Sequence, residues 1–334
     1  MIGEYLNNMK KSKKSIIKLE PSVKEHIWGG TKLKEKYDKK SNNKIISETW
    51  ELSAHKDGPS IIASGKYKGV KFNEYISIMG HEILGSKSER YTDLPILIKF
   101  IDTADDLSVQ VHPDDEYALK YEKDYGKNEI WYVVDCESNS YLYCGFNKDI
   151  SKDEIRQRIS DGTLLEVLNK VPVFKGQNIF IKTGTVHAIG KGLLICEIQQ
   201  SSNVTYRLFD YNRIDKNGEK RPLHIDKALD VIDCKKFEID QINKDEPTTA
   251  EKSLDYQKLI ECEYFSVERY SIQDHIELYG KKDSFISIVV TEGEGSIYAE
   301  GEKLDFKSTD CFLIPAGESK IEIIGKCTFL KVYL

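Results

Sequence analysis

The amino-acid sequence predicts a mainly β protein that contains two small β-barrels and a helical insertion. Short apolar or alternating runs, rich in Ile, Val, Tyr and Phe, are separated by Gly, Asp, Asn and Pro, which is typical of antiparallel sandwiches and barrels. The segment 178–184 resembles the segment 310–317, and each copy lies between other strand-like runs. Two copies of one barrel would account for the 334 residues, a length that exceeds a typical single domain.

The expected strands are short and follow one another along the chain. Each consists of apolar or alternating side chains bounded by turn-forming residues, as strands in barrels do. The clearest examples are 96–101, 107–111, 130–134, 178–181, 193–198, 205–209, 286–290 and 328–334.

Helical patterns are few and lie mainly in the middle of the chain. The segments 151–154 and 163–166 have the Ser/Thr-x-x-Glu spacing of a capping box, and apolar residues at helical spacing follow each of them. The segments 113–126 and 222–232 are further helix candidates. We therefore expect a helical insertion at about 146–172 in an otherwise β scaffold.

The repeat suggests how the chain divides into domains. We expect a first domain at 1–240 that binds a metal, and a second, degenerate barrel at 255–334 that does not. His187 follows the first copy of the repeat at the place where Lys320 follows the second, so only the first copy offers a ligand there. The polar, highly charged segment 235–258 would connect the two domains, and the alternative is a solvated excursion within one domain.

Composition excludes several classes of protein. Net charge is 49 − 55 = −6, so the chain lacks the bulk attraction for phosphate backbones of a typical nucleic-acid binder. Seven Cys without a C-x-x-C pair argue against a disulfide framework and a zinc ribbon. No run approaches the roughly 18 apolar residues of a membrane span, and no signal sequence is evident. We expect a cytoplasmic protein without nucleic-acid or membrane partners.

The segment 107–113 carries the densest set of polar candidates. Alternate residues of a strand share a face, so Leu107, Val109 and Val111 would point into a core, whereas Ser108, Gln110 and His112 would point together the other way. Three polar groups on one face of an apolar strand need water, protein partners or a ligand. Gln110 and His112 could bind one metal ion side by side, and a solvated polar face is the alternative.

Two further residues complete a candidate metal site. Glu129 opens the next apolar strand, and His187 lies at the tip of a turn. With Gln110 and His112 they form a set of four nitrogen and oxygen ligands, of which two imidazoles and one carboxylate are common around zinc with an open position. Zinc with one carboxylate would give the site a net charge near +1, which stabilises a developing enolate oxygen. The same ligands accept Mn, Fe, Co or Ni.

Several charged residues lie in strand-like surroundings. Lys99 and Arg207 each interrupt an apolar run, and together with Ser108 they would suit a phosphate dianion. Lys99 could instead extend its ammonium group to the surface. Lys127 lies two residues before the candidate ligand Glu129. Glu197, an acid in another apolar run, could orient a ligand histidine, act as a base or bind substrate hydroxyls.

The sequence resembles the type I mannose-6-phosphate isomerases, in particular their shorter bacterial form. The matching segments occur in family order and are 28–30, 47–55, 95–99, 107–115, 127–129, 184–188 and 197–213. The resemblance implies the cupin superfamily, with two jelly-roll barrels of which the one at 255–334 binds no metal. It also implies an isomerase that interconverts mannose 6-phosphate and fructose 6-phosphate through a metal-stabilised cis-enediol, with one zinc ion per chain.

The same resemblance assigns roles to individual residues. The family's active-site arginine corresponds to Arg207, which would stabilise charge because it stays protonated. The substrate-lining residues of the family correspond to Lys99, Ser108 and Lys127. The metal ligands correspond to Gln110, His112, Glu129 and His187.

The catalytic base is left open. Lys127, Glu197 and a metal-bound hydroxide are all plausible bases. Many relatives carry an Asp four residues before the arginine, where this chain has Asn203. An amide cannot act as a general acid or base, so a proposal that requires an acid at this position does not transfer to this chain.

Other functions are compatible with parts of this pattern. A non-catalytic metallo-cupin that binds or senses a sugar phosphate would use the same ligands. A cupin oxygenase would more often use three His with a carboxylate, and a storage-type bicupin would need no converging ligands. The expected partner is a hexose 6-phosphate, and the expected assembly is a monomer or a homodimer.

Overall fold

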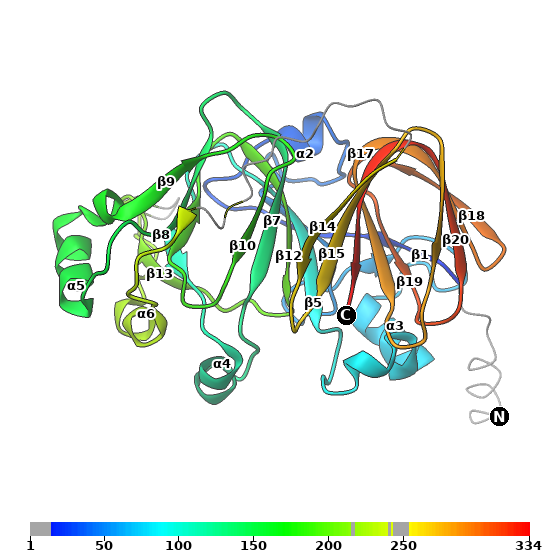
Figure 1. The fold of residues 1–334 in the computed structure, drawn as a ribbon, viewed down its shortest axis with the longest axis horizontal. Helices are drawn as coiled ribbons and strands as arrows, with labels where there is room; N and C mark the ends of the chain where they lie inside the picture. Colours follow the sequence, from blue (N-terminus) through cyan, green and yellow to red (C-terminus); the bar gives the residue numbers. More distant parts are fainter. Residues whose placement is uncertain (1–14, 215–217, 240–241, 243–253) are drawn as a thin grey trace. The chain divides into compact units, whose positions relative to one another are not determined.

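The computed structural model describes residues 15–214, 218–239, 242 and 254–334 (Figure 1). Strands dominate this part of the chain, which confirms the predicted mainly β class. All seven cysteines are free, as their odd number and spacing predict. Among the described residues, no helix is long and apolar enough to cross a membrane.

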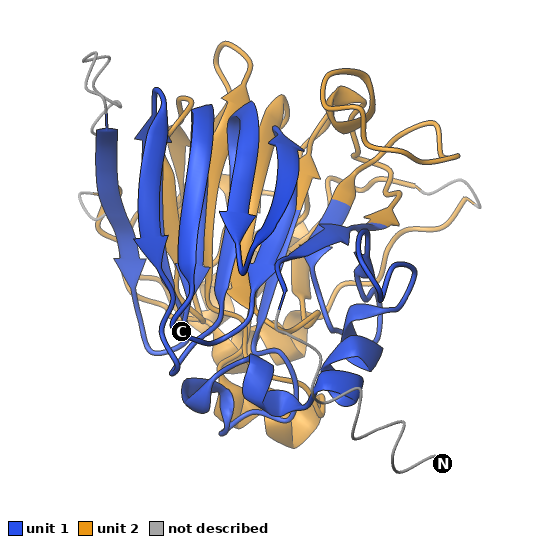
Figure 2. Cartoon of the chain, turned by 90° about the vertical axis from the view of Figure 1, so that its right-hand side faces the viewer, with its two compact units in different colours: residues 1–22, 49–99, 249–334 blue, residues 23–48, 100–248 orange. Residues whose placement is uncertain are grey.

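The chain forms two compact units, which Figure 2 shows in different colours. Unit 1 comprises 1–22, 49–99 and 249–334, and unit 2 comprises 23–48 and 100–248. The predicted division into 1–240 and 255–334 follows the chain order and stays a prediction. Of the predicted connection at 235–258, residues 240–241 and 243–253 lie outside the described part. Three strands cross the division between the units: β2 (Ser22–Lys24), β3 (Glu48–Leu52) and β5 (Ile96–Asp102).

Unit 1 is built on one antiparallel sheet. Its strands follow the order β14-β15-β20-β17-β19-β1-β4, while β16 pairs with β20 and β18 with β17. Apolar side chains alternate along these strands and bury one face, on which Tyr270 and Phe329 stack with ring centroids 5.2 Å apart. The strands are β1 (Ile17–Glu20), β4 (Ile61–Ile62), β14 (Leu254–Glu261), β15 (Ser266–Ile272), β16 (His275–Tyr279), β17 (Ile286–Ala299), β18 (Glu302–Lys307), β19 (Cys311–Ile314) and β20 (Lys320–Tyr333). The helices are α3 (Phe72–Met79) and the short 3-10 turns His81–Ile83 and Ser86–Ser88.

Unit 2 contains two groups of antiparallel strands. One is a five-stranded sheet with the order β13-β6-β11-β8-β9, and in the other β7 pairs with β10 on one side and β12 on the other. A core that includes Trp131, Ile195 and Leu142 draws side chains from both groups. The strands are β6 (Val109–Val111), β7 (Glu129–Cys136), β8 (Tyr141–Phe146), β9 (Leu168–Pro172), β10 (Asn178–Ile181), β11 (His187–Ile189), β12 (Leu193–Gln200) and β13 (Tyr206–Phe209).

Two helices of unit 2, α5 and α6, pack against the five-stranded sheet. Val109 and Val111 share a second core with Ile155 of α5 and Leu229 of α6. Leu107, which the strand pattern groups with these two valines, packs in the other core instead, because β6 begins only at residue 109. The helices are α2 (Lys32–Glu35), α4 (Asp115–Tyr121), α5 (Lys152–Asp161), α6 (Ile225–Val231) and the 3-10 turn Leu164–Val167.

The predicted helical insertion is present, and its first capping box is confirmed. The Ser151 side chain accepts a hydrogen bond from the Glu154 backbone N–H at 3.1 Å, and α5 starts directly after it. The second predicted box is wrong: Thr163 makes no capping hydrogen bond and precedes only a 3-10 turn. Gly162 ends α5 in the left-handed conformation, which leaves too few residues before β9 for another α-helix.

One buried carboxyl in unit 2 gives a prediction about stability. Asp102 ends β5 without exposed surface, and its Oδ2 accepts the Leu33 N–H at 3.1 Å. Its Oδ1 has no hydrogen-bond partner among the described residues. Burial raises the pKa of Asp102 to about 6 from the ordinary 3.8. Between these two values the folded chain holds a proton that the unfolded chain loses, so this carboxyl lowers stability as pH rises.

We therefore expect Asp102→Asn to be more stable than the wild type by about 1–3 kcal/mol above roughly pH 6. The difference should shrink as pH falls below about 6 and vanish only below about pH 4, where Asp102 is neutral in the unfolded as well as the folded chain. Urea unfolding at a series of pH values measures it. Asp226→Asn, which changes a side chain that is 88% exposed, is the control and should stay within about 0.5 kcal/mol. A difference that does not change with pH would contradict the prediction.

Candidate active site

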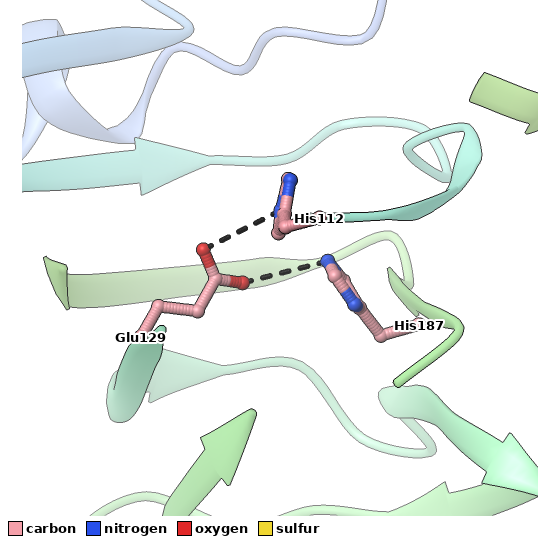
Figure 3. A group of neighbouring side chains, drawn as sticks. All are labelled: His112, Glu129 and His187. Carbon is pink, nitrogen blue, oxygen red and sulfur yellow. Dashed lines mark ion pairs between the residues drawn. The ribbon is translucent and has the colours of Figure 1, made fainter. Parts of the chain in front are cut away.

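Three buried side chains converge at the ends of three strands of unit 2. His112 follows β6, Glu129 opens β7 and His187 opens β11. Each offers one ligand atom, and these atoms all lie within 4.8 Å of one another (Figure 3). Glu129 comes from the group of strands around β7, and the two histidines come from the five-stranded sheet. The convergence predicted from the sequence is therefore present for these three residues.

Each oxygen of the carboxylate faces one of the two imidazoles. Glu129 Oε2 is 3.6 Å from His112 Nε2, and Glu129 Oε1 is 3.4 Å from His187 Nε2 (Figure 3). Backbone carbonyls fix both rings, because His112 Nδ1 lies 2.8 Å from the Val204 oxygen and His187 Nδ1 lies 2.8 Å from the Thr185 oxygen. A carbonyl only accepts hydrogen bonds, so each ring carries its proton on Nδ1 and presents Nε2 to the cluster.

Gln110 joins this cluster from the centre of β6. It lies opposite His187 on β11 and opposite Arg207 on β13 in the sheet register. Its Nε2 is 3.3 Å from His187 Nε2. All four residues predicted as metal ligands are thus brought together.

His187 is uncharged in this environment at neutral pH. Its side chain has no exposed surface, and this burial lowers the pKa of His187 to about 4, with the nearby Lys127 acting in the same direction. The Thr185 carbonyl opposes the shift without cancelling it. A neutral imidazole keeps a lone pair on Nε2, which is the form that binds metal ions.

Lys127 and Glu197 lie directly beside the cluster. The Lys127 ammonium group donates to Glu129 Oε2, lies 3.1 Å from His112 Nε2 and is 3.5 Å from Glu197 Oε1. The indole N–H of Trp131 donates to Glu197 Oε2 at 2.8 Å. Lys127 and Glu197 are buried, so these contacts compensate the free energy of removing two charges from water.

Ser108 and Arg207 form a second, adjoining pair. The Arg207 Nε–H donates to Ser108 Oγ at 3.2 Å, and its Nη1–H donates to the Pro222 carbonyl at 2.9 Å. A register shift in β13 sets Arg207 opposite Gln110 but Phe209 opposite Val109. Burial lowers the pKa of Arg207 from its ordinary value, and the charge of Arg221 lowers it further.

Lys99 belongs to unit 1, unlike the other predicted site residues. It is buried in β5, and its ammonium group lies 5.3 Å from the ring centroid of Trp50 in the same unit. This contact explains how the lysine is accommodated in an apolar strand, since an aromatic face attracts a cation. Its role toward a substrate stays a prediction.

Two buried amides that support the cluster were not predicted from the sequence. The backbone N–H and the Nδ2 of Asn128 donate to Gln200 Oε1 at 2.9 and 2.8 Å, and Asn128 Oδ1 accepts the Thr183 N–H at 3.1 Å. Asn128 thus ties the start of β7, which carries Glu129, to the turn before His187. The available signal was a pair of glutamines at the end of the apolar run 193–198.

Two family models match the chain. The catalytic domain of type I phosphomannose isomerase matches residues 16–147, and the cupin domain of mannose-6-phosphate isomerase matches residues 255–334. The mannose-6-phosphate isomerase ManA of Bacillus subtilis is 37% identical over 313 residues, which cover 92% of this chain and 96% of that protein. The chain belongs to the type I mannose-6-phosphate isomerase family. The enzyme of that name from Streptococcus mutans is 34% identical, over 89% of this chain and 91% of that protein.

Solved structures agree with this membership. The crystal structure of the mannose 6-phosphate isomerase from Bacillus subtilis superposes with a TM-score of 0.86 at 34% identity, and covers 96% of this chain and 99% of that chain. A zinc-bound mannose 6-phosphate isomerase shares the fold, with a TM-score of 0.76 at 17% identity over 96% of this chain and 99% of that chain. The predicted family and cupin class are therefore confirmed.

The buried amides generate a prediction about the stability of this family member. Asn128→Ala removes the acceptor of the Thr183 N–H and one of the two donors to Gln200 Oε1, so we expect the free energy of unfolding to fall by about 1–3 kcal/mol. Urea unfolding at neutral pH measures the change. Asn147→Ala is the control, because its exposed amide donates a single bond to the Glu166 carbonyl, and its effect should stay within about 0.5 kcal/mol. Equal effects of the two substitutions would contradict the prediction.

Proposed function

We propose that the chain interconverts mannose 6-phosphate and fructose 6-phosphate with one zinc ion per chain. The observation that carries the proposal is the buried cluster of His112, Glu129 and His187 in a chain of this isomerase family. Lys127 lies directly beside this cluster. The cytoplasmic location and the assembly as monomer or homodimer stay predictions.

The residues of the cluster suit a zinc ion. Neutral imidazole nitrogens and one carboxylate are its usual ligands in catalytic sites, and the Nε2 atoms of both histidines face Glu129. Gln110 would add a neutral oxygen, so the site would keep a positive charge. When bound, the ion would supply Lewis-acid polarisation of the substrate oxygens at C1 and C2.

The surrounding residues would bind and orient the sugar phosphate. Arg207, next to Ser108, offers a guanidinium fork that matches a phosphate group. A substrate-binding role of Lys99, in unit 1, stays a prediction. Phosphate binding lies remote from the reacting carbons, so its binding energy would serve to position them.

A base near the cluster would then move the proton. Removal of the C2 proton of the open-chain aldose gives a cis-enediol, and its return at C1, with a second proton passing between the two oxygens, gives the ketose. Lys127 and Glu197 are the candidate bases of this chain. Trp131 orients Glu197, because its indole N–H donates to Glu197 Oε2.

Turnover is the direct test. We expect purified protein supplied with zinc to convert mannose 6-phosphate, measured as fructose 6-phosphate in a coupled assay. Protein stripped by a chelator should lose at least about 90% of this rate and recover it with zinc, because the proposed reaction depends on the ion. Metal and sugar-phosphate binding without turnover would instead identify a non-catalytic metallo-cupin and overturn the proposal.

The ligand assignment has its own test. His112→Ala and Glu129→Ala should weaken zinc binding by roughly 10-fold or more, since each removes one ligand. Competition with a chromophoric chelator measures the affinity. His275→Ala, which changes an exposed histidine at the start of β16, is the control and should bind zinc as the wild type does. Wild-type affinity in both ligand variants would place the metal elsewhere.

A further inference from the structure

The Arg207 side chain lies in a closed ring of contacts within unit 2. Its Nη1–H donates to the Pro222 carbonyl at 2.9 Å. Residues 207 and 222 belong to different segments of the chain. Other contacts must therefore hold the Pro222 carbonyl next to the Arg207 guanidinium. A guanidinium has five N–H donors, and the direction in which its remaining donors point depends on this acceptor.

The residue before the proline supplies the anchor. The Arg221 Nε–H donates to Asp210 Oδ2 at 2.8 Å, and its Nη2–H donates to Asp210 Oδ1 at 2.6 Å. Two parallel hydrogen bonds fix both the position and the orientation of a guanidinium. Arg221 precedes a proline and is therefore biased toward extended backbone, and the proline ring fixes φ of Pro222. Little freedom is left between the anchored fork and the Pro222 carbonyl.

Asp210 closes the ring because it lies three residues after Arg207. It follows the end of β13, it is 6% exposed, and its Oδ1 also accepts the Arg213 Nη2–H at 2.5 Å. Burial acts to raise the pKa of Asp210, but the hydrogen bonds from Arg221 and Arg213 outweigh it and hold the pKa below its ordinary value. The anchor is thus a carboxylate throughout the neutral range.

A second tie joins the same two segments through their backbones. The Arg207 N–H donates to His224 Nδ1 at 3.1 Å, and the His224 N–H donates to the Arg207 carbonyl at 2.8 Å. The backbone of Arg207 and its guanidinium are therefore both held by the segment 221–224. The Asp210–Arg221 contact holds the start of that segment.

We propose that Asp210 and Arg221 are positioning residues that aim the Arg207 guanidinium at the phosphate group of the sugar phosphate. The inference rests on the proposed function, because it takes the ligand of Arg207 from it. Asp210 and Arg221 act through Pro222 and need not touch the substrate. A displacement of about 1 Å in a binding group can reduce a rate by up to roughly 100-fold, so the fork geometry of Arg221 matters as well as its charge.

The test uses two conservative variants and a matched control. Arg221→Lys keeps the charge and removes the fork, whereas Asp210→Asn keeps the shape and removes the charge. Each should raise KM for mannose 6-phosphate and the inhibition constant of inorganic phosphate by roughly 10-fold, with a smaller change in kcat and unchanged zinc content. Arg213→Lys is the control, because Arg213 donates to the same carboxylate but is not the neighbour of Pro222 in the chain. Its effect on KM and on the inhibition constant should stay below about 2-fold.

A double variant separates positioning from a structural role. If Arg221 acts through Arg207, then Arg221→Lys should add less than about 2-fold to KM on an Arg207→Lys background, whereas independent effects would multiply. Multiplying effects, or single variants that behave like Arg213→Lys, would overturn the inference. The two single variants each change one partner of the Asp210–Arg221 contact. If one of them does not fold, the other is sufficient for the test. If the wild type lacks turnover, the proposed function fails. Equilibrium binding of inorganic phosphate to the same variants then still tests whether Asp210 and Arg221 position Arg207.

Discussion

Glu129 carries a carboxylate that has no exposed surface, and the surrounding part of unit 2 is arranged around it. Removing such a group from water costs several kcal/mol unless nearby groups compensate. Lys127 donates to one oxygen, and the imidazoles of His112 and His187 lie beside the two oxygens. These partners come from different strands, so the compensation exists only when the end of β6 and the starts of β7 and β11 meet at one place. The chemistry and the strand register are thus one constraint.

A second layer of hydrogen bonds restricts the positions and rotations of these side chains. Backbone oxygens of Val204 and Thr185 set the rotation of the two imidazole rings, and the Asn128 amide joins the beginnings of the segments that carry Glu129 and His187. Groups held in this way need little reorganisation when a ligand arrives. Arg207 is held in the same way, because its side chain and its backbone are both hydrogen-bonded to the segment 221–224.

Local patterns in the sequence predicted the residues of this site better than the residues that hold them in place. The period of two in 107–112 is sufficient to turn Gln110 and His112 to one face, and Ser151 starts α5 by a bond to Glu154, three residues away. Asn128 and Gln200 are 72 residues apart, and no spacing rule connects an amide with a partner so remote. Thr163 failed as a cap because the chain had only a few residues in which to reach β9, which is a tertiary constraint that a capping motif does not contain.

The register shift in β13 has a wider consequence for how this protein can change. Arg207 and Phe209 would share a face in a regular strand, but the irregularity sets Arg207 with Gln110 and Phe209 with Val109. Such bulges redirect a side chain at the cost of one ladder position. Phe209 therefore packs against the core that α5 and α6 share, while Arg207 lies on the polar face of Ser108 and Gln110. A substitution at Phe209 therefore acts on the core that α5 and α6 share, whereas a substitution at Arg207 acts on the polar face of the same strand.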